Sequence, residues 1–264
     1  MSEAKYIHGT QEAERRRLST FNQLVNPSFL SFLQVDSAKS VLEVGSGLGL
    51  LTREVALRLP EAEVVGIEYS EAQLARADHG LPNLRFFQGD AHDLNFEDNY
   101  FDVVYCRWVL EHVADPLRVL QEMRRVARPD GRVFVEEVDT AAQCYDPPVP
   151  RFEKVWGQVA VLQQKLGGDS LIGRRLFRLL KVAGFTDVRL SMGTEVYWSG
   201  TPGLTVWVNN EAAIVEGCRS ELVSRGLVSQ AEIEEAIAEL RGLCERDDAT
   251  SWYYWNRAVA LKPR

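Results

Sequence analysis

Short apolar runs alternate with longer amphipathic stretches along much of the chain. Runs of this length are typical of strands that are buried on both faces. They lie at residues 40–44, 63–68, 84–88, 101–106 and 132–138. The stretches at 50–58, 71–79 and 116–127 have helical spacing instead. Strands that alternate with helices predict a mostly parallel sheet with helices on both of its faces.

The ends of the chain follow a different rhythm. Residues 10–34 predict a helix that Pro27 interrupts or restarts. After residue 138 the pattern predicts the following elements: a helix that ends at Gly167-Gly168, a helix over 173–184, a strand near 188–197, two helices within 203–247, and a strand at 252–261. The last strand is expected to pair with the 188–197 strand in antiparallel fashion.

Together these elements predict an α/β fold with a seven-stranded, mostly parallel sheet and an antiparallel last strand. We expect residues 1–37 to form an N-terminal helical lid and residues 38–139 to form the core. Residues 140–264 would complete the sheet. They would also carry helical cap inserts at about 140–172 and 198–250.

Composition places the chain among ordinary globular proteins. Of its 264 residues 45% are hydrophobic and 26% are charged, which argues against wholesale disorder. The 38 acidic and 30 basic residues give a net charge of −8. A nucleic-acid binder needs an excess of Lys and Arg to neutralise phosphates, so no nucleic-acid partner is expected.

The sequence also bears on location and metals. It contains no window of about 18 apolar residues, so no membrane span is expected, and its start lacks the apolar segment of a secretory signal. The four cysteines are far apart, which fits reduced thiols and a cytoplasmic location. The four histidines form no convincing ligand cluster with acidic residues, so no metal is expected.

The most informative stretch is Glu43-Val-Gly-Ser-Gly-Leu-Gly49, between a predicted strand and a predicted helix. Glycines allow a sharp turn and close approach to a ligand, and the following helix offers unpaired N–H groups. A dinucleotide fingerprint requires GxGxxG, but the third glycine would fall at Leu50. This spacing counts against a nucleotide-dependent oxidoreductase.

These residues resemble the first motif of class I S-adenosylmethionine-dependent methyltransferases, which have a Rossmann-like fold. Later segments match the same family in order. They are 66–70 at the end of the second strand, 89–94 after the third, 101–113 at the fourth and 129–132 before the fifth. The resemblance covers about residues 38–138 and implies S-adenosylmethionine as the cofactor and S-adenosylhomocysteine as the product.

The resemblance implies a role for each matched position. Glu68 would accept both ribose hydroxyls, Asp90 would receive the adenine amino group, and Glu43 would steer the loop and the methionine end. Arg107 would either contribute backbone near the methionine moiety or pair its side chain with a carboxylate. The complete set of expected cofactor-binding residues is Tyr6, Glu43, Gly45, Ser46, Gly47, Glu68, Tyr69, Asp90, Ala91 and Arg107.

Catalysis places weaker demands on the sequence. Methyl transfer from a sulfonium needs alignment above all, and sometimes the removal of a proton. His112 is a candidate general base, although this position is often structural in the family. Tyr6 and His8 would belong to a lid over the cofactor, or to a mobile tail.

The methyl acceptor is expected to be a small, apolar or aromatic molecule, methylated at O, N or C. The predicted inserts and their surroundings are rich in aromatic residues and methionine, namely Tyr145, Trp156, Trp198, Trp207 and Met192. These side chains could equally form ordinary core or a dimer contact, and the oligomeric state stays open. A non-catalytic module of the same fold and a protein methyltransferase are the alternatives. The Asp146-Pro147-Pro148-Val149 stretch follows the fifth strand rather than the fourth, so it does not match amino-group methyltransferases of nucleic acids.

Overall fold

The computed structural model describes residues 12–264, with side chains from residue 17 onward. The chain forms two compact units. The sheet unit contains residues 26–138, 172–193 and 255–264, and the helical unit contains the described residues up to 25 together with 139–171 and 194–254. Strands β7 (Thr186–Trp198) and β8 (Thr250–Leu261) and helix α1 (Glu12–Leu33) pass from one unit into the other.

Five strands of the sheet unit are parallel neighbours. They are β1 (Ser40–Val44), β2 (Glu63–Glu68), β3 (Leu84–Gln88), β4 (Phe101–Arg107) and β5 (Ala127–Glu137). Their order is β3-β2-β1-β4-β5, so the direction of the chain's progress reverses between β1 and β4. In such sheets, ligands bind beyond the carboxyl ends of the strands at this reversal.

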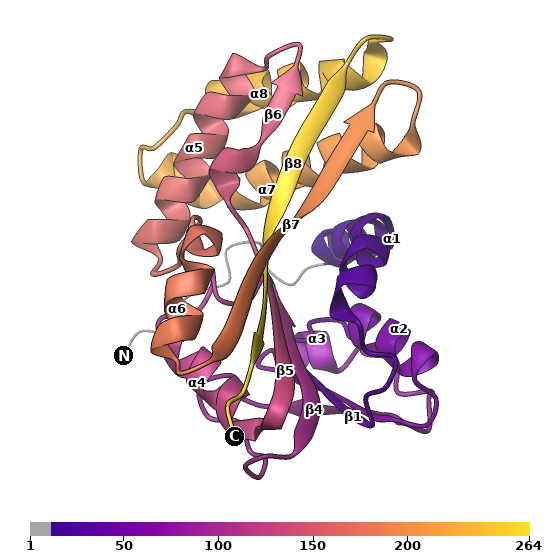
Figure 1. The fold of residues 1–264 in the computed structure, drawn as a ribbon. Helices are drawn as coiled ribbons and strands as arrows, with labels where there is room; N and C mark the ends of the chain where they lie inside the picture. Colours follow the sequence, from indigo (N-terminus) through magenta and orange to yellow (C-terminus); the bar gives the residue numbers. More distant parts are fainter. Residues whose placement is uncertain (1–11) are drawn as a thin grey trace. The chain divides into compact units, whose positions relative to one another are not determined.

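Strand β8 completes the sheet with antiparallel pairing. Its residues 256–261 pair with β5. Within the helical unit, residues 250–252 pair with a short strand, β6 (Cys144–Asp146). Strand β7 also pairs with β8, and Figure 1 draws the two in opposite directions.

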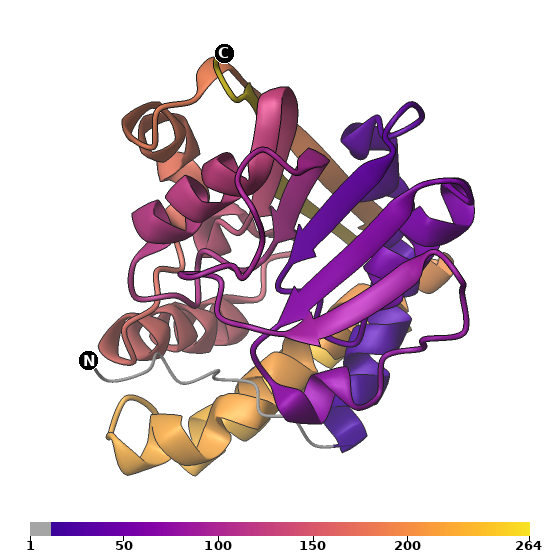
Figure 2. The same cartoon turned by 90° about the horizontal axis from the view of Figure 1, so that it is seen from below.

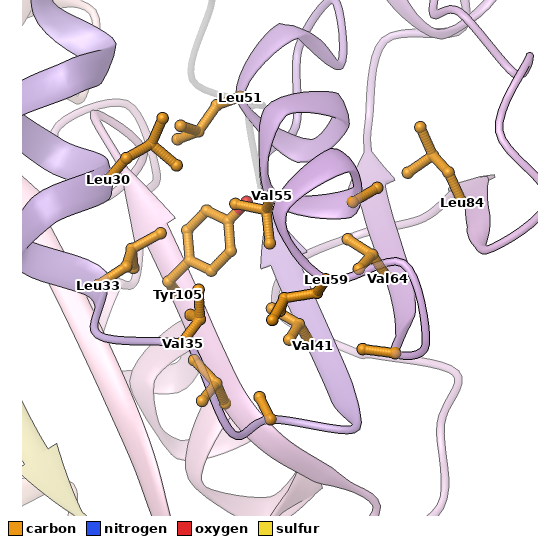
Figure 3. Packing of buried hydrophobic residues seen from close by; sticks show 14 of the residues in the cluster. Leu30, Leu33, Val35, Val41, Leu51, Val55, Leu59, Val64, Leu84 and Tyr105 are labelled. Carbon is orange, nitrogen blue, oxygen red and sulfur yellow. The ribbon is translucent and has the colours of Figure 1, made fainter.

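Helices cover both faces of the parallel strands, as Figure 2 shows. Helix α4 (Pro116–Val126) packs against β4, β5 and α6 (Leu176–Val182), which follows the 3-10 turn Ile172–Arg175. Residues of α1 and of α2 (Leu50–Arg58) cover the opposite face in one apolar cluster. Figure 3 shows the Tyr105 ring of β4 beside Val55 of α2 and close to Leu33 of α1.

The helical unit is built around three helices and an aromatic core. The helices are α5 (Pro150–Lys165), α7 (Pro202–Ser224) and α8 (Gln230–Gly242), with short 3-10 turns at Thr140–Ala142 and Leu243–Glu245. Trp207 of α7 is 1% exposed and packs its ring against Phe21, Tyr197 and Tyr253. Within residues 12–264, none of the helices combines the length and the apolar character needed to cross a membrane.

The predicted α/β class, its mostly parallel strands and its antiparallel end are confirmed. Within residues 12–264 the sheet has eight strands rather than seven, because the short β6 also pairs with β8. Residues of the inserts expected at about 140–172 and 198–250 fall largely in the helical unit, and the described part of the predicted 1–37 segment is divided between the two units at Val25.

Three local predictions were wrong in extent. Helix α1 runs through Pro27 without interruption, because the buried Val25 and Phe29 hold it on either side. The helix predicted at 71–79 ends at Leu74, after which Asp78 accepts hydrogen bonds from Arg53 and from the Gly80 backbone. The turn predicted at 129–131 lies inside β5 as an irregularity in its pairing with β4.

Replacing Leu33 by Ala should lower the free energy of unfolding by about 2–5 kcal/mol, because this side chain is fully buried and its loss leaves a cavity. Urea denaturation measures the change. Leu57→Ala is the matched control: Leu57 is 53% exposed, and its change should stay within about 0.5 kcal/mol. Equal losses in the two variants would contradict the packing described for α1.

Candidate functional site

The glycine loop turns sharply at the carboxyl end of β1. Gly45, Gly47 and Gly49 have φ angles of 75°, 54° and 71°, in the left-handed region that glycine adopts without strain. The N–H groups of Gly45 and Ser46 both donate to the carbonyl oxygen of Ile67, each at 2.8 Å. The loop is therefore fixed to the end of the neighbouring strand β2.

Glu68 lies at the end of β2 and faces this loop. One of its carboxylate oxygens accepts the N–H of Gly47 and the other accepts the N–H of Ser70, both at 2.8 Å. A carboxylate has about four lone-pair positions, so each oxygen can accept a further hydrogen bond from a ligand. The two backbone donors set the orientation of the carboxylate in advance.

The base of the loop is tightly packed and holds a polar atom. A Cβ atom at Gly45 would lie 2.4 Å from a methyl group of Val109, which follows β4, so no larger residue fits there without a shift. Ser46 is buried, and its hydroxyl has no hydrogen-bond partner among the residues that the structure describes. Such a hydroxyl is a group that a bound ligand can satisfy.

Glu43 is buried beneath the loop on β1. Its Oε2 accepts hydrogen bonds from the hydroxyls of Thr52 on α2, at 2.5 Å, and Tyr105 on β4, at 2.9 Å. Burial raises the pKa of this carboxyl to about 7, although Thr52, the charge of Arg107 and Tyr105 act in the opposite direction. The carboxyl group thus connects three elements that meet under the glycine loop.

Arg107 ends β4 with its guanidinium turned into the protein. The group is buried over the rings of Trp108 and Phe29, at 4.3 and 5.4 Å from the ring centres. Burial lowers the pKa of Arg107, while the nearby carboxylates of Glu136 and Glu43 oppose this change. The two expected roles of Arg107, backbone near the methionine moiety or a side chain paired with a carboxylate, both stay predictions.

The segment after β4 is strained and held by a carboxylate that the sequence analysis missed. Trp108 has a φ of 57°, which is uncommon for a bulky residue and costs backbone energy. Glu137, at the end of β5, accepts the N–H groups of Val109 at 2.9 Å and Leu110 at 2.7 Å. The sequence offered one signal for this residue: the acidic pair Glu136-Glu137 directly follows the apolar residues 133–135.

Glu137 and His112 belong to the same local cluster. Burial raises the pKa of Glu137, and the nearby Glu111 carboxylate adds to this effect. His112 lies in the turn with its Nε2 3.6 Å from an oxygen of Glu111, and its backbone N–H donates to the carbonyl of Val109. Since Val109 also contacts Gly45, this turn adjoins the glycine loop.

The remaining expected residues lie beyond β2 and β3. The N–H of Gly89 donates to the carbonyl of Glu68, which places Asp90 next to the end of β2. Asp90 is half-exposed, and hydrogen bonds from His92 outweigh the effect of partial burial and lower its pKa. Ala91 is half-buried and Tyr69 is 58% exposed.

The expected residues Tyr6 and His8 lie outside the described part of the chain. The other predicted cofactor-binding positions lie at or just after the carboxyl ends of adjacent parallel strands, and their contact with a cofactor stays a prediction. The lone-pair capacity of Glu68 and the partnerless hydroxyl of Ser46 suit a ligand that carries hydroxyl or amino donors. Among residues 12–264, no three His, Cys, Asp or Glu side chains gather to form a possible metal site.

Comparisons with known proteins define the family. Residues 42–135 match the model of a methyltransferase domain. Trans-aconitate 2-methyltransferase of Deinococcus radiodurans is 38% identical over 181 residues, which are 66% of this chain and 69% of that protein. The chain therefore belongs to the S-adenosylmethionine-dependent methyltransferases with a Rossmann-like fold.

Further similarities concern parts of proteins or the fold alone. A ubiquinone biosynthesis O-methyltransferase of Pseudomonas syringae is 40% identical over 114 residues, 41% of this chain and 48% of that protein. The chain spans 45–58% of the length of several other curated relatives. A phosphoethanolamine N-methyltransferase of Haemonchus contortus, solved with S-adenosylhomocysteine, has a TM-score of 0.57 at 18% identity, covering 94% of this chain and 57% of its own.

The pKa of Glu43 predicts a pH-dependent stability. The folded protein keeps this carboxyl protonated up to about pH 7, whereas the unfolded chain ionises it near 4.5. The folded state thus binds more protons between these values, and the free energy of unfolding should fall as pH rises through this range. Glu43→Gln should remove this component, which amounts to at most about 3 kcal/mol.

Urea denaturation from pH 4.5 to 7.5 measures the effect as a difference between the wild type and the variant. Glu61→Gln removes an exposed acid from the same unit and serves as the control. If the free energy of unfolding of Glu43→Gln changed with pH in parallel with that of the wild type over the whole range, the pKa of Glu43 would not be raised.

Proposed function

We propose that the chain binds S-adenosylmethionine at the carboxyl edge of β1, β2 and β4 and transfers its methyl group to a small organic molecule. The observation that carries this proposal is the Glu68 carboxylate, which two backbone N–H groups orient opposite the glycine loop. The cofactor supplies a methyl group that its sulfonium already activates for in-line displacement. The protein then has to bind, orient and exclude water.

Each residue at this edge has a distinct task in the proposal. Glu68 accepts the two ribose hydroxyls, because its oxygens keep lone pairs beside the Gly47 and Ser70 N–H groups. Ser46 provides a hydroxyl under the loop, and Asp90 accepts the adenine amino group. Glu43 does not need to touch the ligand, since it fixes α2 and β4 beneath the loop.

Further expected cofactor contacts have a weaker basis. Tyr69 and Ala91 adjoin Glu68 and Asp90 in sequence, and the backbone of Gly45 adjoins Ser46. The Arg107 side chain acts through carboxylates in this proposal, and only its backbone would face the methionine end.

A small-molecule acceptor is supported by the relatives, whose names refer to trans-aconitate and to ubiquinone biosynthesis. The net charge of −8 argues against a nucleic acid. Four free cysteines are consistent with a reducing, cytoplasmic location. Two of the aromatic residues expected near the acceptor, Tyr145 and Trp207, are buried in the core of the helical unit. These two residues therefore give no support for an apolar acceptor.

Replacing Glu68 by Ala should weaken S-adenosylmethionine binding by roughly 100-fold or more, because two charge-assisted hydrogen bonds are lost. Calorimetric titration with S-adenosylmethionine and S-adenosylhomocysteine measures the affinity. Glu71→Ala is the matched control, since it removes an exposed acid three residues away and should leave binding unchanged.

The result separates the possible functions. Loss of binding in Glu68→Ala alone supports the proposed site, and screening for metabolites that gain one methyl group then identifies the acceptor. Wild-type protein that binds neither ligand would overturn the proposal and favour a non-catalytic module. Capture of a specific methylated protein would favour a protein methyltransferase.

We also propose His112 as the proton acceptor when the reacting group needs deprotonation. Its turn adjoins the glycine loop, and Glu111 lies beside the imidazole. His112→Gln should then lower kcat by roughly 10²–10⁴-fold, with S-adenosylmethionine affinity unchanged. Unchanged kcat would assign His112 a structural role.

A further inference from the structure

A group of buried polar side chains lies inside the helical unit. Tyr145 of β6 and Ser251 of β8 are direct cross-strand partners, so their side chains share one face of the strands. Gln143, two residues before Tyr145, donates to its hydroxyl at 2.5 Å. The Trp207 ring of α7 packs 5.3 Å from that of Tyr253, which lies two residues after Ser251 on the same face of β8, and this contact places α7 over the face.

Glu211 adjoins this group from α7. It follows Trp207 by four residues and therefore lies on the same side of the helix. Its charge acts on the hydroxyl of Tyr145 and raises the pKa of that group, to which burial contributes more. Glu211 is only 4% exposed, so its carboxyl group faces the interior of the unit.

Three oxygen atoms in this group lack hydrogen-bond partners among residues 12–264. They are Oε2 of Glu211, Oε1 of Gln143 and Oγ of Ser251. A buried polar atom without a partner costs about 1–3 kcal/mol, and a bound hydrogen-bond donor would recover part of that cost. A carboxylate and an amide oxygen accept hydrogen bonds, and a hydroxyl can also accept one.

Aromatic rings pack beside Trp207 and Tyr145 in the same unit. The Trp207 ring lies 5.3 Å from that of Tyr253 and 5.6 Å from that of Phe21, and the Tyr145 ring lies 5.9 Å from that of Phe152. The faces of such rings attract cations, most strongly when water is excluded. The environment thus combines hydrogen-bond acceptors with rings that favour positive charge.

We propose that the helical unit contains a binding site for a small molecule with a protonated amine, and that Glu211 is the counter-ion of this amine. An ammonium group carries up to three N–H donors, and the oxygens of Glu211, Gln143 and Ser251 are acceptors of the kind that it needs. A neutral alcohol would satisfy one of them, and an anion would be repelled by Glu211. The site does not depend on the proposed methyl transfer.

Other charged groups near the site are compatible with this ligand. Arg17 of α1 donates to Asn210 and acts on Glu211 from a distance, and Glu153 of α5 adds negative charge near Tyr145. Burial raises the pKa of Glu211 to about 8, against the opposing effects of Arg17 and Asn210. At pH 7 the carboxyl group is therefore mostly protonated until a cation arrives.

Calorimetric titration with phenethylamine at pH 7, in buffers of different ionisation enthalpy and without cofactor, tests the proposal. Binding should release about one proton per amine, because the ammonium group ionises Glu211. The isosteric alcohol 2-phenylethanol should bind roughly tenfold or more weakly and release no proton. Proton release is measured on the wild-type protein, so it does not rely on a variant that folds.

Two variants locate the effect. Glu211→Gln should weaken phenethylamine binding roughly tenfold or more and abolish proton release. Glu216→Gln, which removes a more exposed acid from the same helix, should change neither. Failure of phenethylamine to bind at millimolar concentrations, or equal binding of the alcohol, would overturn the proposal. Water would then be the hydrogen-bond partner of the three oxygens. Neither outcome changes the expected binding of S-adenosylmethionine to the wild type and to Glu68→Ala, so the two proposals can fail independently.

Discussion

The burial of one carboxyl group beneath the glycine loop constrains the whole binding edge. Glu43 cannot reach water, so it must be satisfied by the protein, and its two partners come from a helix and a strand that are distant in sequence. This arrangement fixes the start of α2 relative to β1 and β4. The loop in between donates two hydrogen bonds to Ile67 at the end of β2, and at Gly45 it packs tightly against Val109.

Much of this edge could be predicted because its determinants are local. The strands β1, β2 and β3 and helix α2 follow from apolar runs and helical spacing, and their bounds agree with the structure. The positive φ angles of Gly45 and Gly47 follow from the residue type itself. The extent of α3 could not be predicted, because after Leu74 the backbone continues in tighter turns, and Asp78 then pairs with Arg53, a contact that spacing does not encode.

Residues whose roles arise from long-range contacts were missed for the same reason. Glu137 holds the turn after β4 from the end of the next strand, and nothing near it in sequence identifies Val109 and Leu110 as its partners. Glu211 reads as one polar residue in a helix, and only the fold brings it near Tyr145. The burial of Arg107 over the ring of Phe29 likewise joins residues that are distant in sequence.

The pairing of β8 has a consequence for the order in which the protein can form during translation. Strand β5 is synthesised about midway along the chain, yet its antiparallel neighbour comprises residues 256–261. While the ribosome is still adding the intervening residues, β5 has an unpaired edge that exposes backbone N–H and C=O groups. Such an edge is a template for pairing with other chains. The nascent protein must therefore shield this edge, by a chaperone or by its own later segments, until the last strand emerges.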